Sequence, residues 1–252
     1  MPRFFIQKEQ VSEDRIHLRG EDAHHIARSL RMAVGDSLTV CDMQGIEYEG
    51  IIESFDEDRE VIVRIERSKR SDREPSCRIT VFQALPKGDK LDTVIQKAVE
   101  CGAYEIVPFE SERCVVRMKQ EAEARKTERR QRIAFEAAKQ SGRSVIPQVM
   151  PTVSFEQMLE LASLCDIKLF CYEGDGTEPL GIVLQKEKET LLKEGATVAI
   201  VIGSEGGFSL DEVAKAKARG LAPIGLGKRI LRTETASGFV LSCLVYVTEL
   251  GG

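Results

Sequence analysis

Histidine is scarce in this sequence of 252 residues, with three residues at positions 17, 24 and 25. Because all three lie near the N-terminus, histidine-based catalysis in the rest of the chain is excluded. The seven cysteines form no C-x-x-C pair and are odd in number, which argues against a zinc site and against a disulfide framework. Most of them lie in apolar runs, as buried reduced thiols do. We therefore expect no bound metal.

Long apolar runs are also missing. None approaches the roughly 18 residues that a membrane span requires. The start of the chain, Met1 to Ile6, is too short and too quickly polar for a signal peptide. With 42% hydrophobic and 31% charged residues, the composition is typical of a soluble globular protein, which we expect in the cytoplasm.

The net charge of −5 is unevenly distributed. Residues 1–72 carry 11 basic and 16 acidic side chains, whereas residues 73–252 balance 25 against 25. Within this neutral part, residues 113–143 hold ten basic side chains against four acidic ones. Such an excess fits a surface that binds a polyanion, and equally a solvated helix face crossed by ion pairs.

Short runs bounded by turn residues mark the N-terminal part. Residues 37–41, 47–55 and 60–66 are typical of strands, and residues 21–30 of one short helix. This pattern predicts a small β-rich domain of barrel type over residues 1–72. Residues 67–76 have the composition of a linker, and we place the domain boundary there.

From residue 73 to residue 252, strands and helices alternate. We expect strands at residues 77–84, 105–109, 166–172, 197–202 and 223–226. Helices are expected at residues 90–101, 122–140, 154–164, 209–219 and 237–250. Capping boxes, Ser154 with Gln157 and Ser209 with Glu212, mark two of the helix starts. The alternation predicts an α/β fold with a largely parallel sheet and helices on both faces.

Two glycine- and charge-bearing segments, Gly203 to Phe208 and Leu226 to Ala236, follow the last two expected strands. Parallel strands end at the same edge of a sheet, and α/β sheets bind ligands at that edge. A third glycine-bearing turn, Tyr172 to Gly176, follows the preceding strand. Taken alone, the glycines of the first segment also fit a simple turn between a strand and a helix. Together, the three turns predict a ligand pocket formed mainly by backbone groups.

Two ligand classes are disfavoured by missing motifs. The first turn of the α/β part, Leu85 to Lys90, lacks the G-x-G-x-x-G pattern of dinucleotide sites, and no P-loop is present. An adenosine-type cofactor suits a pocket of backbone groups, because its rings also need an apolar slot. Ile202, Leu226, Ile230 and Leu231 are candidates for that slot.

These features resemble the RsmE-type ribosomal RNA methyltransferases of the SPOUT superfamily over essentially the whole chain. The resemblance rests on His24 to Gly35, Lys90 to Val116 with its run Glu112-Arg113-Cys114, Glu136 to Pro147 with its run Gln140-Ser141-Gly142-Arg143, and both C-terminal segments. Its most specific part is the run Leu231 to Ala236. Where Ser204 stands, the family usually has proline.

The resemblance implies a C-terminal SPOUT domain whose chain forms a trefoil knot. It also implies an N-terminal PUA-like β-barrel that helps to bind RNA, and a homodimer through the knotted domains. The implied reaction is transfer of a methyl group from S-adenosyl-L-methionine to N3 of a specific uridine in 16S ribosomal RNA, either as naked RNA or in the small ribosomal subunit.

Site residues follow from the same resemblance. The candidate catalytic residues are Arg232, which would stabilise negative charge on the uracil carbonyls, and Glu234 or Glu205, which would accept the N3 proton or position Arg232. Candidate cofactor-binding residues are Tyr172, Glu173, Ile202, Gly203, Glu205, Gly206, Gly207, Leu226, Gly227, Ile230, Leu231, Thr235 and Ala236. Candidate RNA-binding residues are Arg3, Arg28, Arg31, Lys87, Lys90, Arg113, Arg143 and Lys228.

Other functions remain compatible with the sequence. One is a non-catalytic RNA-binding protein with the same fold. Another is a methyltransferase of the same superfamily that acts on ribose 2′-oxygen or on transfer RNA. For Glu234, the alternative role is a salt bridge that holds its loop. The β-rich N-terminal part and the run Arg232 to Ala236 favour a uridine base as the substrate.

Overall fold

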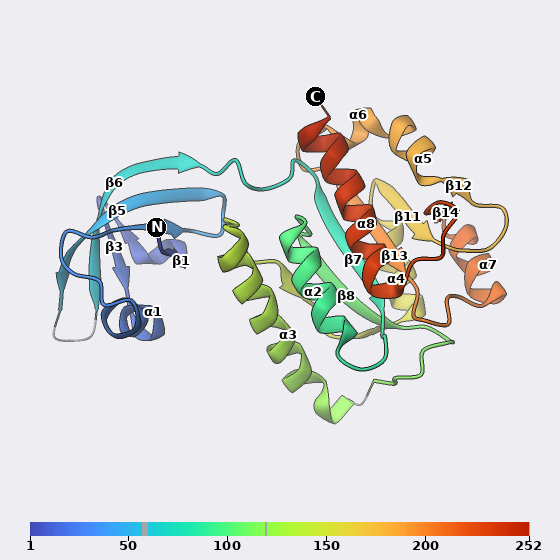
Figure 1. Cartoon of the computed structure of the whole chain (residues 1–252), viewed down its shortest axis with the longest axis horizontal. Coiled ribbons are helices and arrows are strands. Elements are labelled where there is room, and N and C mark those ends of the chain that lie inside the picture. The colour runs from blue at the N-terminus through green and yellow to red at the C-terminus, as the bar shows by residue number, and fades with distance from the viewer. Residues whose placement is uncertain (57–59, 119, 252) are drawn as a thin grey trace. The chain divides into compact units, whose positions relative to one another are not determined.

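The computed structural model of the chain describes residues 1–56, 60–118 and 120–251. Contacts within the chain divide it into two compact units (Figure 1). The first comprises Met1–Glu74 with Ala138–Ile146, and the second comprises Pro75–Ala137 with Pro147–Gly252. In the part of the chain that the structure describes, no helix combines the length and the apolar character that crossing a membrane requires.

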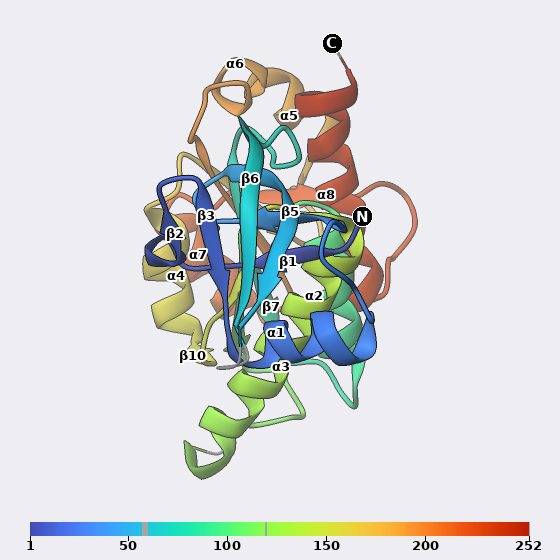
Figure 2. The same cartoon turned by 90° about the vertical axis from the view of Figure 1, so that its left-hand side faces the viewer.

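The first unit is built on one six-stranded sheet with the order β1-β4-β5-β6-β3-β2, in which only the β1–β4 pair is parallel (Figure 2). The strands are β1 Arg3–Phe5, β2 Val11–Ser12, β3 Arg15–Leu18, β4 Ser37–Cys41, β5 Ile46–Phe55 and β6 Val61–Arg70. The helical segments are η1 Lys8–Gln10, α1 Gly20–His24 and the π turn η2 His25–Ser29, so the expected helix at 21–30 is present in two parts.

The sheet of the first unit is curled. Its register shifts at Glu49/Gly50 and at Ile52/Ser54, and such bulges bend and twist a strand. A Cβ at Gly50 would lie 2.5 Å from Val63 Cγ1, so glycine allows the close approach of β5 and β6. The core of this unit consists of apolar side chains, among them Leu18 from β3 and Ile26 from η2. The expected β-rich, barrel-like unit is confirmed.

The expected linker at 67–76 is wrong in its first part, because β6 continues to Arg70 and pairs with β5. Opposite charges face each other across these two strands: Glu47 pairs with Lys69, and Glu49 pairs with Arg67. Such cross-strand pairs stabilise a sheet even where one strand, here the end of β6, has the charged composition of a linker. For this reason, the charged composition of this segment did not indicate that the strand continues to Arg70.

The second unit contains an all-parallel sheet with the order β10-β8-β7-β13-β11-β14-β12, and β9 also pairs with β8. The strands are β7 Arg78–Ala84, β8 Glu105–Glu110, β9 Gln148–Val149, β10 Val153–Ser154, β11 Ile167–Cys171, β12 Glu178–Pro179, β13 Thr197–Ile202 and β14 Pro223–Gly225. The helices are α2 Lys90–Glu100, α3 Gln120–Ser141, α4 Phe155–Ser163, α5 Leu180–Lys186, α6 Lys188–Leu191, α7 Leu210–Ala218, α8 Thr233–Val245 and the π turn η3 Tyr246–Leu250.

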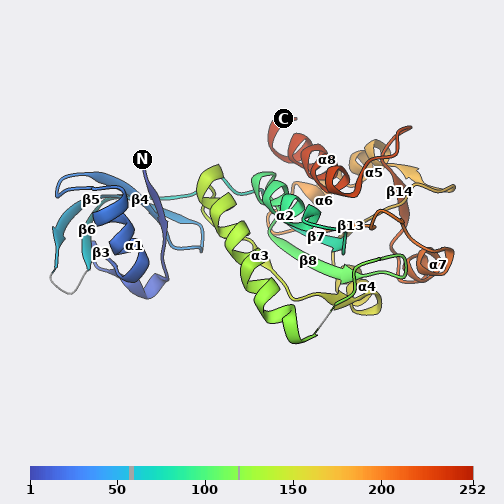
Figure 3. The ribbon, with the colours of Figure 1, turned by 60° about the horizontal axis from the view of Figure 1, so that its bottom comes forward.

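Helices cover both faces of this sheet, as the sequence predicts. Helices α2 and α8 pack together on one face, and α4 and α7 lie on the other (Figure 3). The central strands are buried on both sides and are therefore continuously apolar, as in the run Val198 to Ile202. Both expected capping boxes are present, at Ser154 and at Ser209. Gly220 follows α7 with a φ of +79°, the left-handed conformation in which glycine commonly ends a helix.

Helix α8 begins at Thr233, four residues before the expected start at residue 237. Arg232 is its N-cap, and the Arg232 carbonyl accepts hydrogen bonds from the backbone N–H groups of Thr235 and Ala236, both at 2.9 Å. The polar run at 232–236 is therefore the first turn of the helix. The side chains of Thr233 and Glu234 in this turn meet partners from other elements, which sequence periodicity does not reveal.

Candidate functional site

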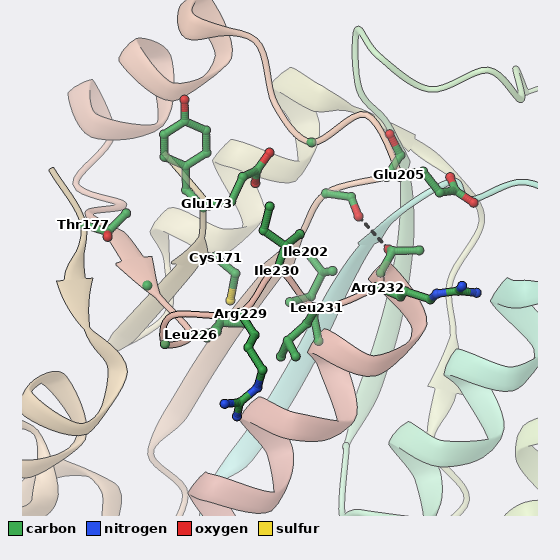
Figure 4. Close-up of a pocket in the computed structure, with 18 of the residues that line it drawn as sticks. Cys171, Glu173, Thr177, Ile202, Glu205, Leu226, Arg229, Ile230, Leu231 and Arg232 are labelled. Carbon is green, nitrogen blue, oxygen red and sulfur yellow. Dashed lines mark hydrogen bonds between the residues drawn. The ribbon is translucent and has the colours of Figure 1, made fainter. Parts of the chain in front are cut away.

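A cavity of about 430 Å³ opens beyond the carboxyl ends of β11, β13 and β14 (Figure 4). Its walls are the ends of these strands, the three turns that follow them, the first turn of α8 and one residue of α2. The lining residues are Lys90, Cys171, Tyr172, Glu173, Thr177, Ile202, Gly203, Ser204, Glu205, Gly207, Gly225, Leu226, Gly227, Lys228, Arg229, Ile230, Leu231, Arg232, Thr233 and Ala236. This volume lies in the range of cofactor and small-molecule sites.

The turn after β13 is tight. The Gly207 N–H donates to the Ser204 carbonyl at 3.0 Å, so a backbone hydrogen bond closes the turn. Gly207 has a φ of +62°, and a Cβ at this position would lie 2.2 Å from Glu173 Oε1. The next residue, Phe208, is 1% exposed and packs 4.4 Å from the Phe170 ring, centroid to centroid. A buried aromatic side chain thus anchors the turn beside the cavity.

The segment after β14 crosses back to β13 and β7. The Thr233 hydroxyl donates to the Gly203 carbonyl at 2.6 Å and accepts from Gln83 Nε2 at 2.8 Å. Gln83 is the penultimate residue of β7 and is fully buried. This network joins the start of α8 to the carboxyl ends of β7 and β13, and so fixes two walls of the cavity relative to each other.

Replacing Thr233 with valine is expected to lower the free energy of unfolding by about 1–3 kcal/mol, because the buried Gln83 amide and Gly203 carbonyl each lose a partner. Valine keeps the shape of threonine. Urea denaturation measures the change. Thr235→Val is the matched control, because Thr235 is exposed in the same helical turn, and it is expected to change stability by no more than about 0.5 kcal/mol. Equal stabilities of the two variants would contradict the role of the network.

A group of charged side chains lies at the rim of the cavity. Lys90 Nζ is 2.8 Å from Glu205 Oε1 and 3.7 Å from Glu234 Oε2. Arg232 Nη1 is 4.0 Å from Glu234 Oε1, and the Arg232 side chain is 82% exposed. The structure therefore brings together all three candidate catalytic residues, with Lys90 between the two carboxylates.

Glu205 is held as a carboxylate. Partial burial raises its pKa, but the hydrogen bonds from Lys90 Nζ and from the Lys87 N–H outweigh burial, so the pKa of Glu205 lies below its usual value. The same contact raises the pKa of Lys90, mainly through the hydrogen bond to Glu205. Glu205 is thus a weak proton acceptor, whereas Glu234 Oε2 is buried and forms no hydrogen bond within the described residues.

Acidification is expected to destabilise the wild-type protein more than a Glu205→Gln variant. Because folding lowers the pKa of Glu205, its contribution is fully present above the unfolded value of about 4.3 and is lost as the pH falls from there through the folded pKa. Melting temperatures of both proteins between pH 7 and pH 3 measure this difference. Parallel curves would show that the Lys90–Glu205 contact does not contribute.

The expected cofactor-binding residues line the cavity, except Gly206 and Thr235. The Gly206 carbonyl instead accepts from Arg113 Nη1 at 3.0 Å. The lining residues that the sequence did not indicate as site residues are Cys171, Thr177, Ser204, Gly225, Arg229 and Thr233. Cys171 and Gly225 are the last residues of strands β11 and β14, and this position is the signal that identifies them. Burial raises the pKa of the Cys171 thiol, so this side chain contributes no charge to the cavity.

The candidate RNA-binding residues are spread over both units. In the second unit, Lys90 and Lys228 line the cavity, and Lys87 and Arg113 contact the turn after β13. In the first unit, Arg28 and Arg31 are exposed.

Two of the expected RNA contacts conflict with the structure. Arg143 is 4% exposed and pairs with Glu74, and the Arg3 side chain is 11% exposed and pairs with Glu47 at 3.0 Å. A guanidinium that is buried in an ion pair is not accessible to a phosphate, so both residues have a structural role.

Several side chains of the basic stretch at 113–143 form ion pairs within the chain. Arg129 pairs with Asp92, Arg130 with Glu123, and Arg132 with Glu128. Of the two interpretations that the composition allows, these contacts favour a helix face crossed by ion pairs. Among the described residues, no group of three or more His, Cys, Asp or Glu side chains is placed to hold a metal ion.

Comparison with known proteins identifies the family. Residues 73–245 match the RNA methyltransferase domain, and residues 18–66 match the RNA methyltransferase PUA domain. Ribosomal RNA small subunit methyltransferase E of Bacillus subtilis (strain 168) is 36% identical over 99% of this chain and 98% of its own length. The protein of that name from Synechocystis sp. is 30% identical over 95% of this chain and 76% of its own length.

Solved structures agree with the sequence relatives. A crystal structure of ribosomal RNA small subunit methyltransferase E from Neisseria gonorrhoeae, bound to S-adenosyl methionine, has a TM-score of 0.82 and 28% sequence identity. The alignment covers 98% of each chain. The expected two-part fold, a PUA unit followed by a parallel α/β methyltransferase unit, is thereby confirmed. The chain belongs to the ribosomal RNA small subunit methyltransferase E family.

Proposed function

We propose that this protein transfers a methyl group from S-adenosyl-L-methionine to N3 of a specific uridine in 16S ribosomal RNA. The observation that carries the proposal is the cavity formed by three strand-end turns, with Arg232, Glu234 and Lys90 at its rim, in a chain of this family. Such a site combines a slot for an adenosine-type cofactor with charged groups for a second, polar substrate.

The lining of the cavity fits S-adenosyl-L-methionine. Ile202, Leu226 and Leu231 provide apolar surface for an adenine ring, and the surrounding glycines expose backbone groups for its polar edge. Glu173 provides a carboxylate in the same cavity, which suits the hydroxyl and ammonium groups of the rest of the molecule. When bound, the cofactor supplies a methyl group that is already activated by the sulfonium charge.

The reaction then requires alignment and proton management by the chain's own residues. Arg232 would donate hydrogen bonds to the uracil carbonyls as negative charge develops on them. Glu234 is the better candidate than Glu205 for accepting the N3 proton, directly or through water, because Glu205 is committed to Lys90 and to the Lys87 N–H. Glu234 also lies within ion-pair distance of Arg232 and would orient it.

The substrate and the assembly are part of the proposal. Uridine N3 lies on the Watson–Crick edge, so the base must be unpaired or flipped out before it reacts. Arg28 and Arg31 of a PUA domain over residues 1–72, with Lys87, Arg113 and Lys228 of a SPOUT domain over residues 73–252, would contact phosphates. The return of the chain from β14 across β13 to α8 supports a trefoil knot, through which we propose a cytoplasmic homodimer.

Two experiments test the proposal. S-adenosyl-L-methionine at a hundred times its Kd should stabilise the protein by about 2.7 kcal/mol, which a thermal melt detects. Mass spectrometry should show that one N3-methyluridine is missing from 16S ribosomal RNA of a strain that lacks the gene. No stabilisation would favour a non-catalytic RNA-binding protein. Loss of a ribose methyl group, or of a transfer RNA methyl group, would favour the other methyltransferase reaction.

A further inference from the structure

The two capping boxes of the second unit differ in one residue. At the start of α4, the Ser154 N–H donates to Gln157 Oε1 at 2.9 Å, and the Gln157 N–H donates to Ser154 Oγ at 3.2 Å. At the start of α7, Glu212 takes the place of the glutamine. Glutamine is sufficient to close such a box, so the cap alone does not account for a carboxylate.

Glu212 is also buried, with an exposed fraction of 4%, whereas Gln157 is exposed. Its two oxygens accept from different segments. Oε2 accepts from the Ser209 N–H of the cap at 2.9 Å, and Oε1 accepts from the Glu112 N–H at 2.8 Å. A carboxylate has two acceptor oxygens and no donor, whereas the amide of glutamine has one acceptor oxygen and one donor group. The hydrogen bond to the second oxygen therefore explains why the buried residue at this position is a glutamate and not a glutamine.

The second contact ties the loop of residues 111–118 to α7. This loop has its own internal hydrogen bonds: the Cys114 N–H donates to the Ser111 carbonyl at 3.1 Å, and Arg117 Nη2 donates to the Glu112 carbonyl at 2.9 Å. Its contacts with the turn after β13 include the bond from Arg113 Nη1 to the Gly206 carbonyl. A Cβ at Gly206 would lie 3.0 Å from Arg113 Cβ, so the loop and the turn are in close contact.

We infer that Glu212 is a positioning residue for the RNA substrate: through the Glu112 N–H it holds the loop of residues 111–118 in place, and so sets Arg113 beside the cavity rim. The inference rests on the proposed function, since Arg113 is one of the proposed phosphate contacts. Glu212 lies outside the cavity lining, so its effect is on RNA and not on the cofactor.

Two variants test this role. Glu212→Gln leaves one acceptor oxygen for two N–H donors, and Glu212→Ala leaves none. Hydrogen exchange of the Glu112 amide should become at least about tenfold faster in Glu212→Ala. The KM for small ribosomal subunits from a strain that lacks the gene should rise about fivefold in Glu212→Ala, with a smaller rise in Glu212→Gln. In both variants, kcat and the Kd for S-adenosyl-L-methionine should stay within about twofold of wild type.

Matched variants separate positioning from general stability. Gln157→Ala removes the other capping box and is expected to leave the KM for subunits unchanged. The effects of Glu212→Ala and Arg113→Ala on KM should be less than additive, because both act through one loop. An unchanged Glu112 exchange rate or an unchanged KM in an active Glu212→Ala protein would overturn the inference. An inactive wild-type protein would instead overturn the proposed function.

Discussion

Replacing Arg232 with alanine is expected to lower kcat for methylation of small ribosomal subunits by about a hundredfold to a thousandfold, the loss seen when a donor to a developing negative charge is removed. The melting temperature should not change measurably, because the side chain is 82% exposed and lies 4.0 Å from its nearest charged partner, Glu234 Oε1. The backbone of Arg232, in contrast, is fixed as the N-cap of α8. A fixed backbone with an exposed guanidinium is what we expect of an arginine that binds the substrate.

The control is Arg229→Ala. Arg229 lines the same cavity and belongs to the same segment, but its guanidinium points in a different direction from that of Arg232 (Figure 4). We expect its kcat to stay within about threefold of wild type, in the range of a single lost surface contact. Arg232→Lys, which keeps the charge but loses the forked donor geometry, should recover only part of the rate. Near-normal turnover of Arg232→Ala would refute the proposed role.

The parallel sheet was predictable because its signals are local. Apolar runs of strand length, such as Val198 to Ile202, alternate with helical patterns whose starts are marked by serines in capping boxes. The end of β6 was not predictable in the same way, because its charged residues are paired with residues of β5 that lie about 20 positions earlier. The composition of a charged segment does not show which residues lie opposite it in the sheet.

The same limit applies to the site. The three turns were predictable because each follows a strand, and the ends of parallel strands converge at one edge. The contacts that fix those turns join residues far apart in the chain: Gln83 and Thr233 are 150 positions apart, and Glu112 and Glu212 are 100 positions apart. No local pattern indicates either pair. The burial of Arg143 in its ion pair with Glu74 was not predicted, for the same reason. A basic side chain is expected to be exposed to solvent when its ion-pair partner is not known.

Replacing Gly207 with alanine is expected to weaken binding of S-adenosyl-L-methionine by about tenfold to a hundredfold. A side chain at a φ of +62° costs roughly 1–2 kcal/mol. The added Cβ would also lie 2.2 Å from Glu173 Oε1, so the Glu173 carboxylate must move from its place in the cavity lining. Isothermal titration calorimetry measures the Kd directly.

Gly220→Ala separates backbone strain from the effect on the cavity. Gly220 has a φ of +79° at the end of α7, but a Cβ there would have nothing within 4 Å. The free energy of unfolding should fall by a similar amount in Gly220→Ala and in Gly207→Ala, whereas the Kd of Gly220→Ala for S-adenosyl-L-methionine should stay unchanged. If Gly207→Ala acts through Glu173, its effect and that of Glu173→Ala should be less than additive, because the two residues are in contact. A Gly207→Ala protein that binds the cofactor as tightly as Gly220→Ala would show that the turn after β13 is not part of the cofactor site.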